Sequence, residues 1–223
     1  MSYPGDTSGV MELGAFRKAL SQPPAAETVA AFQSSPEIQR LPIQFDIVKL
    51  REALAEVERR KGFSDDVWGA IPLTQKPGHT GPWSQSDLSG LYHMRADERY
   101  VEEPFEDFVD EAQFSEFVPD LSDTYFAHVH AELTKHMKIG RMRILRKVSY
   151  NANSWHRDPE PRIHIPIITN PGSLFIVNNH CTHLPADGHA YFTDTRGYHT
   201  AVNGGLQPRV HIVAALPEGL LTA

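Results

Sequence analysis

Apolar and polar residues alternate in short runs through the carboxyl-terminal part of the chain. Six such runs follow Gly140, and turn signals such as Asn-Pro-Gly and Asn-Gly-Gly separate them. Successive side chains of a strand leave opposite faces, so these runs predict strands with one face against a core. The predicted strands cover residues 142–148, 162–168, 173–177, 189–192, 199–202 and 209–214. Short strands at such spacing are typical of an antiparallel sandwich or jelly roll.

Helical periodicity is confined to the part of the chain before these strands. After Asp46, a residue type that caps helices, apolar residues recur at three- and four-residue spacing until Gly62 supplies a stop. A second amphipathic helix is predicted over residues 124–137, and two shorter ones near 9–20 and 26–32. We therefore expect one domain, 1–223, in which residues 1–139 are mostly helix and loop and residues 140–217 form the β core.

Composition and charge narrow the classes of partner. With 40% hydrophobic and 22% charged residues, the 223-residue chain has the composition of a globular domain. Its 21 Lys and Arg against 28 Asp and Glu leave no excess basic charge for a phosphate backbone, so we expect no nucleic-acid partner. No apolar stretch is long enough to span a bilayer, so we expect no membrane partner either. The single cysteine, Cys181, is typical of a reducing compartment, and a cytoplasmic location is expected.

The segment 97–123 is strongly acidic, with 11 Asp and Glu against a single Arg99. Phenylalanines punctuate it at helical spacing, at positions 105, 108, 114 and 117. Two interpretations stay open: a solvated acidic face over a packed aromatic stripe, or an acidic surface that binds a partner.

Candidate metal ligands lie among the predicted strands, where seven of the 12 histidines are found. His156 and Asp158 form an H-x-D triplet, and in an extended segment residues i and i+2 leave the same face. His199, near the start of a later strand, could complete a set of two imidazoles and one carboxylate. This set leaves coordination positions open and is used by non-haem Fe(II) oxygenases.

Cationic groups on neighbouring strands could bind a carboxylate beside such a metal. Arg209 lies ten residues after His199 on the next predicted strand, and a guanidinium grips a carboxylate bidentately. The run 162–167 alternates strictly, with Arg162 and His164 on one face and isoleucines on the other. Either Arg162 and His164 point inward beside the metal, or they face solvent over an isoleucine core.

Three stretches together resemble the aspartyl/asparaginyl β-hydroxylase family, whose relatives include bacterial proline cis-hydroxylases. The stretches are SWHRDPEPRIHIPIITNPGSLF, the span from His183-Leu184 through Asp187-Gly188 to Phe192, and YHTAVNGGLQPRVHIV. The resemblance covers roughly residues 140–217, and the joint order of H-x-D, R-x-H, N-P, H-x3-N and R-x-H is what makes it specific.

The resemblance implies a double-stranded β-helix core, of the jelly-roll or cupin-like kind, flanked by α-helices. It also implies a dioxygenase that uses Fe(II), 2-oxoglutarate and O2. By motif match the catalytic metal ligands would be His156, Asp158 and His199, and the residues that contact 2-oxoglutarate would be Arg209, Arg162 and His164. Asn203, four residues after His199, is expected to order a turn rather than touch substrate.

The expected reaction is hydroxylation of an unactivated C–H bond, with succinate and CO2 as coproducts. The substrate would be a small molecule or peptide: an amino acid, or an amino-acid side chain in a small peptide or peptide-like product. One alternative is a hydroxylase of protein side chains, of the Asp/Asn type. Two others are a metal-binding jelly-roll binding or sensor protein without turnover, and a cupin-like metal isomerase or dioxygenase that needs no 2-oxoglutarate.

Overall fold

The computed structural model describes residues 9–21, 31–63, 69–83, 94–96, 102–104 and 109–219. Most of the predicted helix 26–32, together with Phe105 and Phe108, lies outside the described residues.

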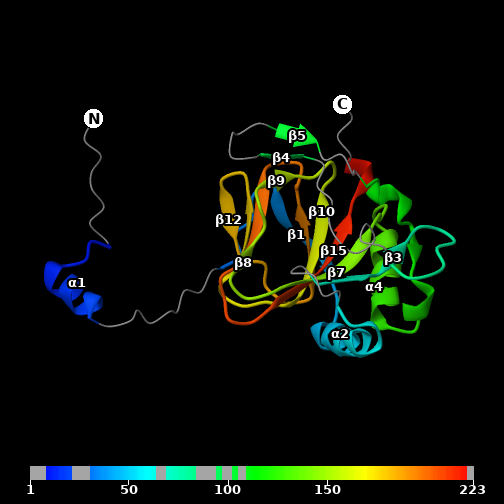
Figure 1. Ribbon diagram of the computed structural model, residues 1–223, viewed down its shortest axis with the longest axis horizontal. Coiled ribbons are helices and arrows are strands. Elements are labelled where there is room, and N and C mark those ends of the chain that lie inside the picture. The colour runs from blue at the N-terminus through cyan, green and yellow to red at the C-terminus, as the bar shows by residue number, and fades with distance from the viewer. Residues whose placement is uncertain are drawn as a thin grey trace.

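Two antiparallel sheets face each other (Figure 1). The first has the strand order β1-β13-β10-β15-β7-β2, and the second has the order β12-β11-β14-β9-β4-β5, with β8 paired to β14. The strands of the first sheet are β1 (Ile38–Gln44), β2 (Ala70–Pro72), β7 (Met142–Lys147), β10 (Arg162–Ile168), β13 (His189–Thr193) and β15 (Arg209–Ala215). Those of the second are β4 (Met94–Ala96), β5 (Glu102–Pro104), β8 (Asn151–Ala152), β9 (His156–Arg157), β11 (Ser173–Val177), β12 (His180–Thr182) and β14 (His199–Asn203).

The chain passes repeatedly from one sheet to the other between β7 and β15. It runs from β7 in the first sheet to β9 in the second, then to β10, β11 and β12, β13, β14 and finally β15. This winding is a double-stranded β-helix, and the predicted fold class is confirmed. All six predicted strands are present, and their ends agree with the prediction to within one residue.

The expectation that residues 1–139 are mostly helix and loop is incomplete. β1 pairs with β13 and β2 pairs with β7, so the earlier part of the chain extends both edges of the first sheet. A small separate sheet joins β3 (Thr74–Gln75) to β6 (Glu116–Phe117). The helical elements are α1 (Leu13–Leu20), α2 (Ile47–Lys61), α4 (Tyr125–Thr134) and the 3-10 turns η1 (Glu111–Gln113), η2 (Pro119–Leu121) and η3 (Pro217–Gly219).

The predicted helix after Asp46 is α2. The Asp46 carboxylate accepts hydrogen bonds from the backbone N–H groups of Val48 and Lys49, and the helix ends at Gly62, whose φ of 68° is in the left-handed region. α4 is shorter than the predicted 124–137. It ends at Thr134 because the N–H groups of Lys135 and His136 bond three residues back instead of four, which tightens the last turn.

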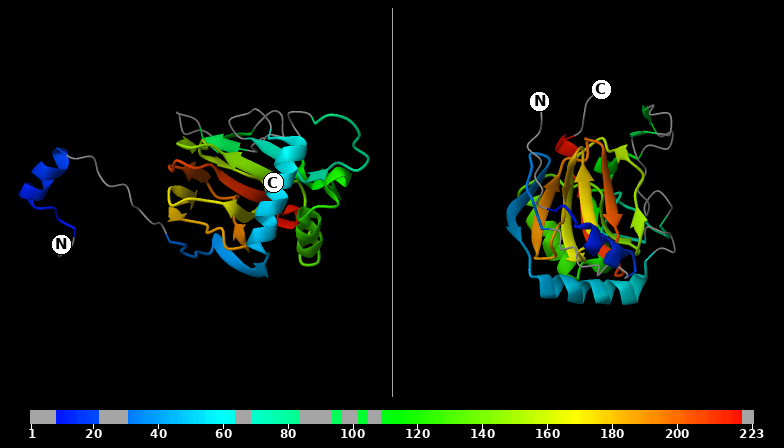
Figure 2. Two further views of the ribbon diagram at one scale, coloured as in Figure 1. Left: turned by 90° about the horizontal axis from the view of Figure 1, so that it is seen from below. Right: turned by 90° about the vertical axis from the view of Figure 1, so that its left-hand side faces the viewer.

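The main apolar core lies outside the barrel, between the first sheet and the helices α2 and α4. Ile163, Ile165 and Ile167 of β10 point into this core, so the opposite face of β10 is turned to the barrel interior. Figures 1 and 2 show both helices outside the barrel. The inward face of β10 carries Arg162 and His164, and a smaller apolar cluster that includes Phe175, Val177 and Tyr191 packs beside them.

The helix α1 has no buried residue and stands apart from the barrel in both figures. Among the described residues, no helix combines the length and the hydropathy that crossing a membrane requires.

Candidate metal centre

His156, Asp158 and His199 meet at one end of the barrel. Their ligand atoms lie within 4.8 Å of one another, and all three residues are buried. His156 on β9 and His199 on β14 are direct partners across the ladder, with ring centroids 4.2 Å apart. The backbone N–H of Asp158 donates to the carbonyl of Thr195, 2.8 Å away, which holds the carboxylate beside both rings. The structure thus brings together the three ligands that the sequence predicts.

Both imidazoles are oriented by backbone carbonyls. Nδ1 of His156 lies 2.7 Å from the carbonyl oxygen of Ser154, and Nδ1 of His199 lies 3.1 Å from that of Gly197. A carbonyl accepts only, so Nδ1 carries the proton and Nε2 keeps its lone pair. Each Nε2 faces Asp158, at 3.9 Å for His156 and 3.7 Å for His199. This is how metal-binding histidines are usually held.

The ionisation of the three groups suits a cation. Burial, with a smaller contribution from His199, lowers the pKa of His156 to about 4, and burial also lowers the pKa of His199. Burial by itself would raise the pKa of Asp158, but the guanidinium of Arg162 and the two imidazoles lower it to about 2. At neutral pH the trio therefore offers two neutral nitrogens and one carboxylate. This donor set fits ferrous iron and leaves positions open for small ligands.

Arg162 lies next to this trio and is surrounded by carboxylates. Its Nε donates to Asp158 Oδ2 at 3.1 Å, and its Nη1 lies 2.5 Å from Glu160 Oε1 and 2.7 Å from Glu111 Oε2. Of the two interpretations of the alternating run, the inward one is correct, because Arg162 and His164 are both buried. Contact between Arg162 and a cosubstrate stays a prediction.

Arg209 lies deeper in the barrel and differs from Arg162 in its neighbours. It is 5% exposed, and among the described residues it forms no ion pair with a carboxylate. Its Nη2 donates to Nδ1 of His211, 2.9 Å away, and burial lowers the pKa of Arg209 to about 9. A buried cation without an anion is costly, and a carboxylate ligand would relieve that cost.

A series of imidazole and phenyl rings in contact lies between Arg209 and the metal ligands. The ring of His211 lies 5.8 Å from that of His164, which lies 4.9 Å from Phe175, and Phe175 stacks at 5.9 Å on His199. Nδ1 of His164 and Nε2 of His211 are buried and have no hydrogen-bond partner within the part of the chain that the structure describes. The space between Arg209 and the trio therefore has polar atoms that a bound dicarboxylate could satisfy.

Several charged residues of this region were not predicted from the sequence. Glu111, Arg141 and Arg143 join the carboxylate cluster around Arg162, and Lys147 lies beside Arg209. Strand alternation could have placed Arg141, Arg143 and Lys147 on one face with Leu145. No local signal distinguishes Glu111 from the other acidic residues of segment 97–123.

Asn203 orders a turn as expected: its Nδ2 lies within 3.2 Å of the carbonyls of Lys147, Val148 and Gln207. Trp155, directly before the ligand His156, is 43% exposed.

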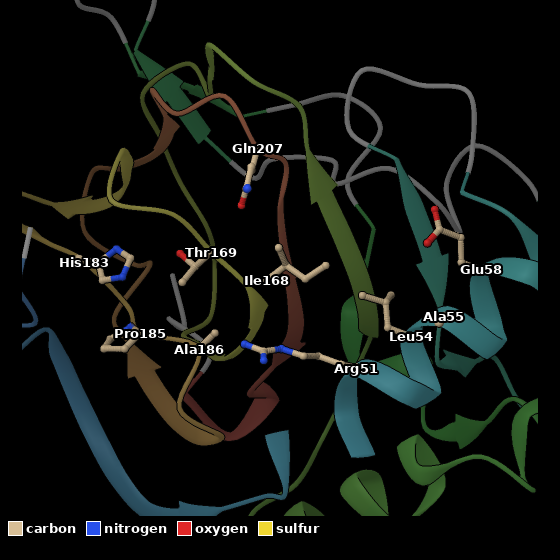
Figure 3. Close-up of a pocket in the computed structure, with 10 residues that line it drawn as sticks. All are labelled: Arg51, Leu54, Ala55, Glu58, Ile168, Thr169, His183, Pro185, Ala186 and Gln207. Carbon is tan, nitrogen blue, oxygen red and sulfur yellow. The ribbon is translucent and has the colours of Figure 1, made fainter. Parts of the chain in front are cut away.

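A surface pocket of about 630 Å³ lies at the end of β10 remote from Arg162 (Figure 3). Arg51 and Leu54 of α2 form one wall, and His183, Pro185 and Ala186 form the other. None of its lining residues belongs to the metal trio.

Comparisons with known proteins give likenesses to solved structures alone. No family model and no curated protein matches the chain. An oxidoreductase of the 2OG-Fe(II) oxygenase family from Burkholderia pseudomallei is 12% identical, with a TM-score of 0.47 over 87% of this chain and 97% of that one. The viral collagen prolyl hydroxylase vCPH from Paramecium Bursaria Chlorella virus-1 is 9% identical, with a TM-score of 0.45 over 81% and 95%. AviO1 from Streptomyces viridochromogenes is 15% identical, with a TM-score of 0.43 over 84% and 92%. All three TM-scores are below 0.5, so these likenesses do not indicate which reaction this chain catalyses.

Proposed function

We propose that the chain is an Fe(II)- and 2-oxoglutarate-dependent dioxygenase that hydroxylates a C–H bond. The observation that carries the proposal is the pairing of two features in one barrel interior: the buried His156, Asp158 and His199, and the buried Arg209 without a carboxylate partner among the described residues. A metal-binding jelly roll needs the first feature alone. A cosubstrate with a distal carboxylate needs both.

The three ligands would hold the iron through two Nε2 atoms and the Asp158 carboxylate. Their orientation is fixed in advance by the carbonyls of Ser154 and Gly197, so little rearrangement is needed on binding. When bound, Fe(II) would supply the oxidation, in which the substrate C–H bond, one O2 and one 2-oxoglutarate give the hydroxylated product, succinate and CO2.

Arg209 would bind the distal carboxylate of 2-oxoglutarate in a bidentate pair. His211 accepts a hydrogen bond from Arg209 through Nδ1, so its Nε2 carries a proton that it can donate to the cosubstrate. His164, between His211 and the metal trio, offers a second ring nitrogen, which no described residue satisfies with a hydrogen bond. The remaining walls are buried side chains such as Phe175, which keep water from the cosubstrate.

We propose as substrate an amino acid, or an amino-acid side chain in a small peptide or peptide-like product. Support for this class is the resemblance of segment 140–217 to a family that includes proline cis-hydroxylases. A protein side chain is the alternative substrate, and product analysis with free amino acids, short peptides and folded proteins separates the two.

The test begins with an anaerobic titration of the protein with Fe(II) and 2-oxoglutarate. We expect a visible charge-transfer band, followed in air by succinate release and a product 16 mass units heavier when a substrate is present. The variant Arg209→Met should keep metal binding but lose 2-oxoglutarate binding. Arg51→Met, which removes an exposed arginine from the surface pocket, is the matched control and should bind both as the wild type does.

The outcomes separate the competing functions. Metal binding without 2-oxoglutarate binding would favour a sensor protein, and turnover without succinate would favour a cupin-like enzyme that needs no cosubstrate. Equal 2-oxoglutarate affinity in Arg209→Met and wild type would refute the assignment of Arg209.

A further inference from the structure

A buried ionic cluster connects the acidic segment before α4 to the metal ligands. Glu111 in η1 is 4% exposed although it belongs to a strongly acidic stretch. Its Oε1 contacts Arg141 and lies 3.9 Å from Nη2 of Arg143, and its Oε2 lies 2.7 Å from Nη1 of Arg162. One carboxylate therefore contacts three buried guanidinium groups.

Arg162 links this cluster to the metal centre. The same guanidinium that contacts Glu111 through Nη1 donates from Nε to Oδ2 of Asp158. Oδ2 is also the Asp158 oxygen that lies 3.7 Å from Nε2 of His199. The contacts thus form a chain from Glu111 through Arg162 to the carboxylate that faces both imidazoles.

The backbone holds Glu111 in this place as well. The carbonyl oxygen of Glu111 accepts a hydrogen bond from the N–H of Arg141, 2.8 Å away. A Cβ atom at Gly140 would lie 2.7 Å from this oxygen, which is closer than real Cβ contacts allow. The glycine therefore lets η1 approach Arg141 and the start of β7, which contains Arg143.

The charge balance explains what Glu111 does for Asp158. Among the described residues of this cluster, three carboxylates face three guanidinium groups: Glu111, Glu160 and Asp158 face Arg141, Arg143 and Arg162. Without the Glu111 charge, Arg162 would be drawn more strongly to Asp158 and would compete there with a bound cation. The uncompensated guanidinium groups would also raise the positive potential at the metal site.

We propose that Glu111 is a positioning residue for Asp158: through Arg162 it holds the carboxylate in place and offsets positive charge beside the metal. This inference rests on the proposed function, because it requires that Asp158 bind a metal.

The experiment measures Mn(II) affinity of the metal-free protein by the electron paramagnetic resonance signal of free Mn(II). We expect Glu111→Gln to weaken Mn(II) binding by about 10- to 100-fold, as loss of groups that orient metal ligands commonly does. The Co(II)-loaded variant should also have a changed visible spectrum, because the Asp158 carboxylate would be displaced. Glu111→Asp, which keeps the charge, should recover part of the affinity.

Two variants serve as controls. Glu116→Gln removes a carboxylate of the same segment that bonds to Gln75 and Gly78 rather than to Arg162. Arg141→Met loosens the cluster but keeps the contact between Glu111 and Arg162. Both should bind Mn(II) within about twofold of the wild type. If Glu111→Gln does not fold, the double variant Glu111→Gln/Arg141→Met, which removes an anion and a cation together, should fold and should still bind Mn(II) more weakly than Arg141→Met, because the contact that positions Arg162 is lost.

Wild-type affinity in Glu111→Gln would overturn the inference, as would an equal loss in Arg141→Met, because general loosening would then explain the effect. Absence of Mn(II) binding by the wild type would instead refute the proposed function. The two failures are therefore distinguishable.

Discussion

Lys147 is a buried amine inside the barrel, opposite Arg209 in the ladder between β7 and β15. It is 3% exposed, and its Nζ donates to the side-chain oxygens of Asn151 and Asn153. Burial, with a contribution from the Arg209 charge, lowers the pKa of Lys147 from 10.5 to about 6. The folded protein therefore holds Lys147 largely neutral at pH 7, whereas the unfolded chain holds it protonated.

This difference predicts how stability changes with pH. Between pH 6 and 10.5 the unfolded state binds one more proton at Lys147, so the free energy of unfolding should rise with pH, by up to about 1.4 kcal/mol per unit. Urea unfolding of the metal-free protein at pH 7, 8 and 9 measures this slope. Lys147→Met should reduce it, while the exposed control Lys138→Met should keep it. An unchanged slope in Lys147→Met would contradict the prediction.

At the scale of elements, the connection between β12 and β13 packs closely against the residues that precede α2. Gly188 has a φ of 86°, and its carbonyl accepts a hydrogen bond from the N–H of Phe45 at 2.9 Å. A Cβ atom at position 188 would lie 2.1 Å from the carbonyl oxygen of Phe45. The contact fixes where β1 ends and α2 begins relative to the barrel.

Gly188→Ala should therefore lower the free energy of unfolding by more than about 1 kcal/mol, since both the positive φ and the close contact resist a side chain. Gly204→Ala is the matched control, because its Cβ would meet the carbonyl oxygen of Gly172 at an ordinary 3.5 Å. We expect a change within about 0.5 kcal/mol there. Denaturant unfolding measures both, and equal losses would argue against a special role for Gly188.

The elements that the sequence predicted best are those whose pattern is local. Alternation predicted β7, β10, β11, β13, β14 and β15 to within one residue at each end, because one face of each meets a core, whereas the three-residue β12 was not predicted. β1 was not predicted, because it contains Pro42, which lacks an N–H. Among the described strands it is an edge strand and pairs with β13 alone.

The residues of the candidate site also differ in whether a local sequence pattern predicts them. His156 and Asp158 are two residues apart, and His199 and Arg209 stand in a recognisable order, so the sequence could place them. The burial of Glu111 depends on arginines 30 and 51 residues away, and no local pattern carries that information.

At the scale of the whole molecule, the two faces of the first sheet pack against different kinds of side chain. The main apolar core lies outside the first sheet, against α2 and α4, and the interior holds the charged and ring groups together with a smaller apolar cluster around Phe175. The metal ligands lie on β9, on β14 and in the segment after β9, and Arg162 on the opposite sheet contacts one of them. A bound ion would therefore link β9, β14 and the segment after β9.

Metal binding should stabilise the folded chain. At a Mn(II) concentration 100 times its dissociation constant, the free energy of unfolding should rise by about 2.7 kcal/mol. Urea unfolding with and without Mn(II) measures the gain, and a chelator should reverse it. His199→Ala should lose most of the gain, and an undiminished gain in that variant would place the ion elsewhere.

The exposed Trp155, one residue before the ligand His156, gives the protein a reporter of its own. An indole so near a paramagnetic ion loses emission when that ion arrives. Occupancy can then be followed by fluorescence quenching, without a dye or a label attached to the chain.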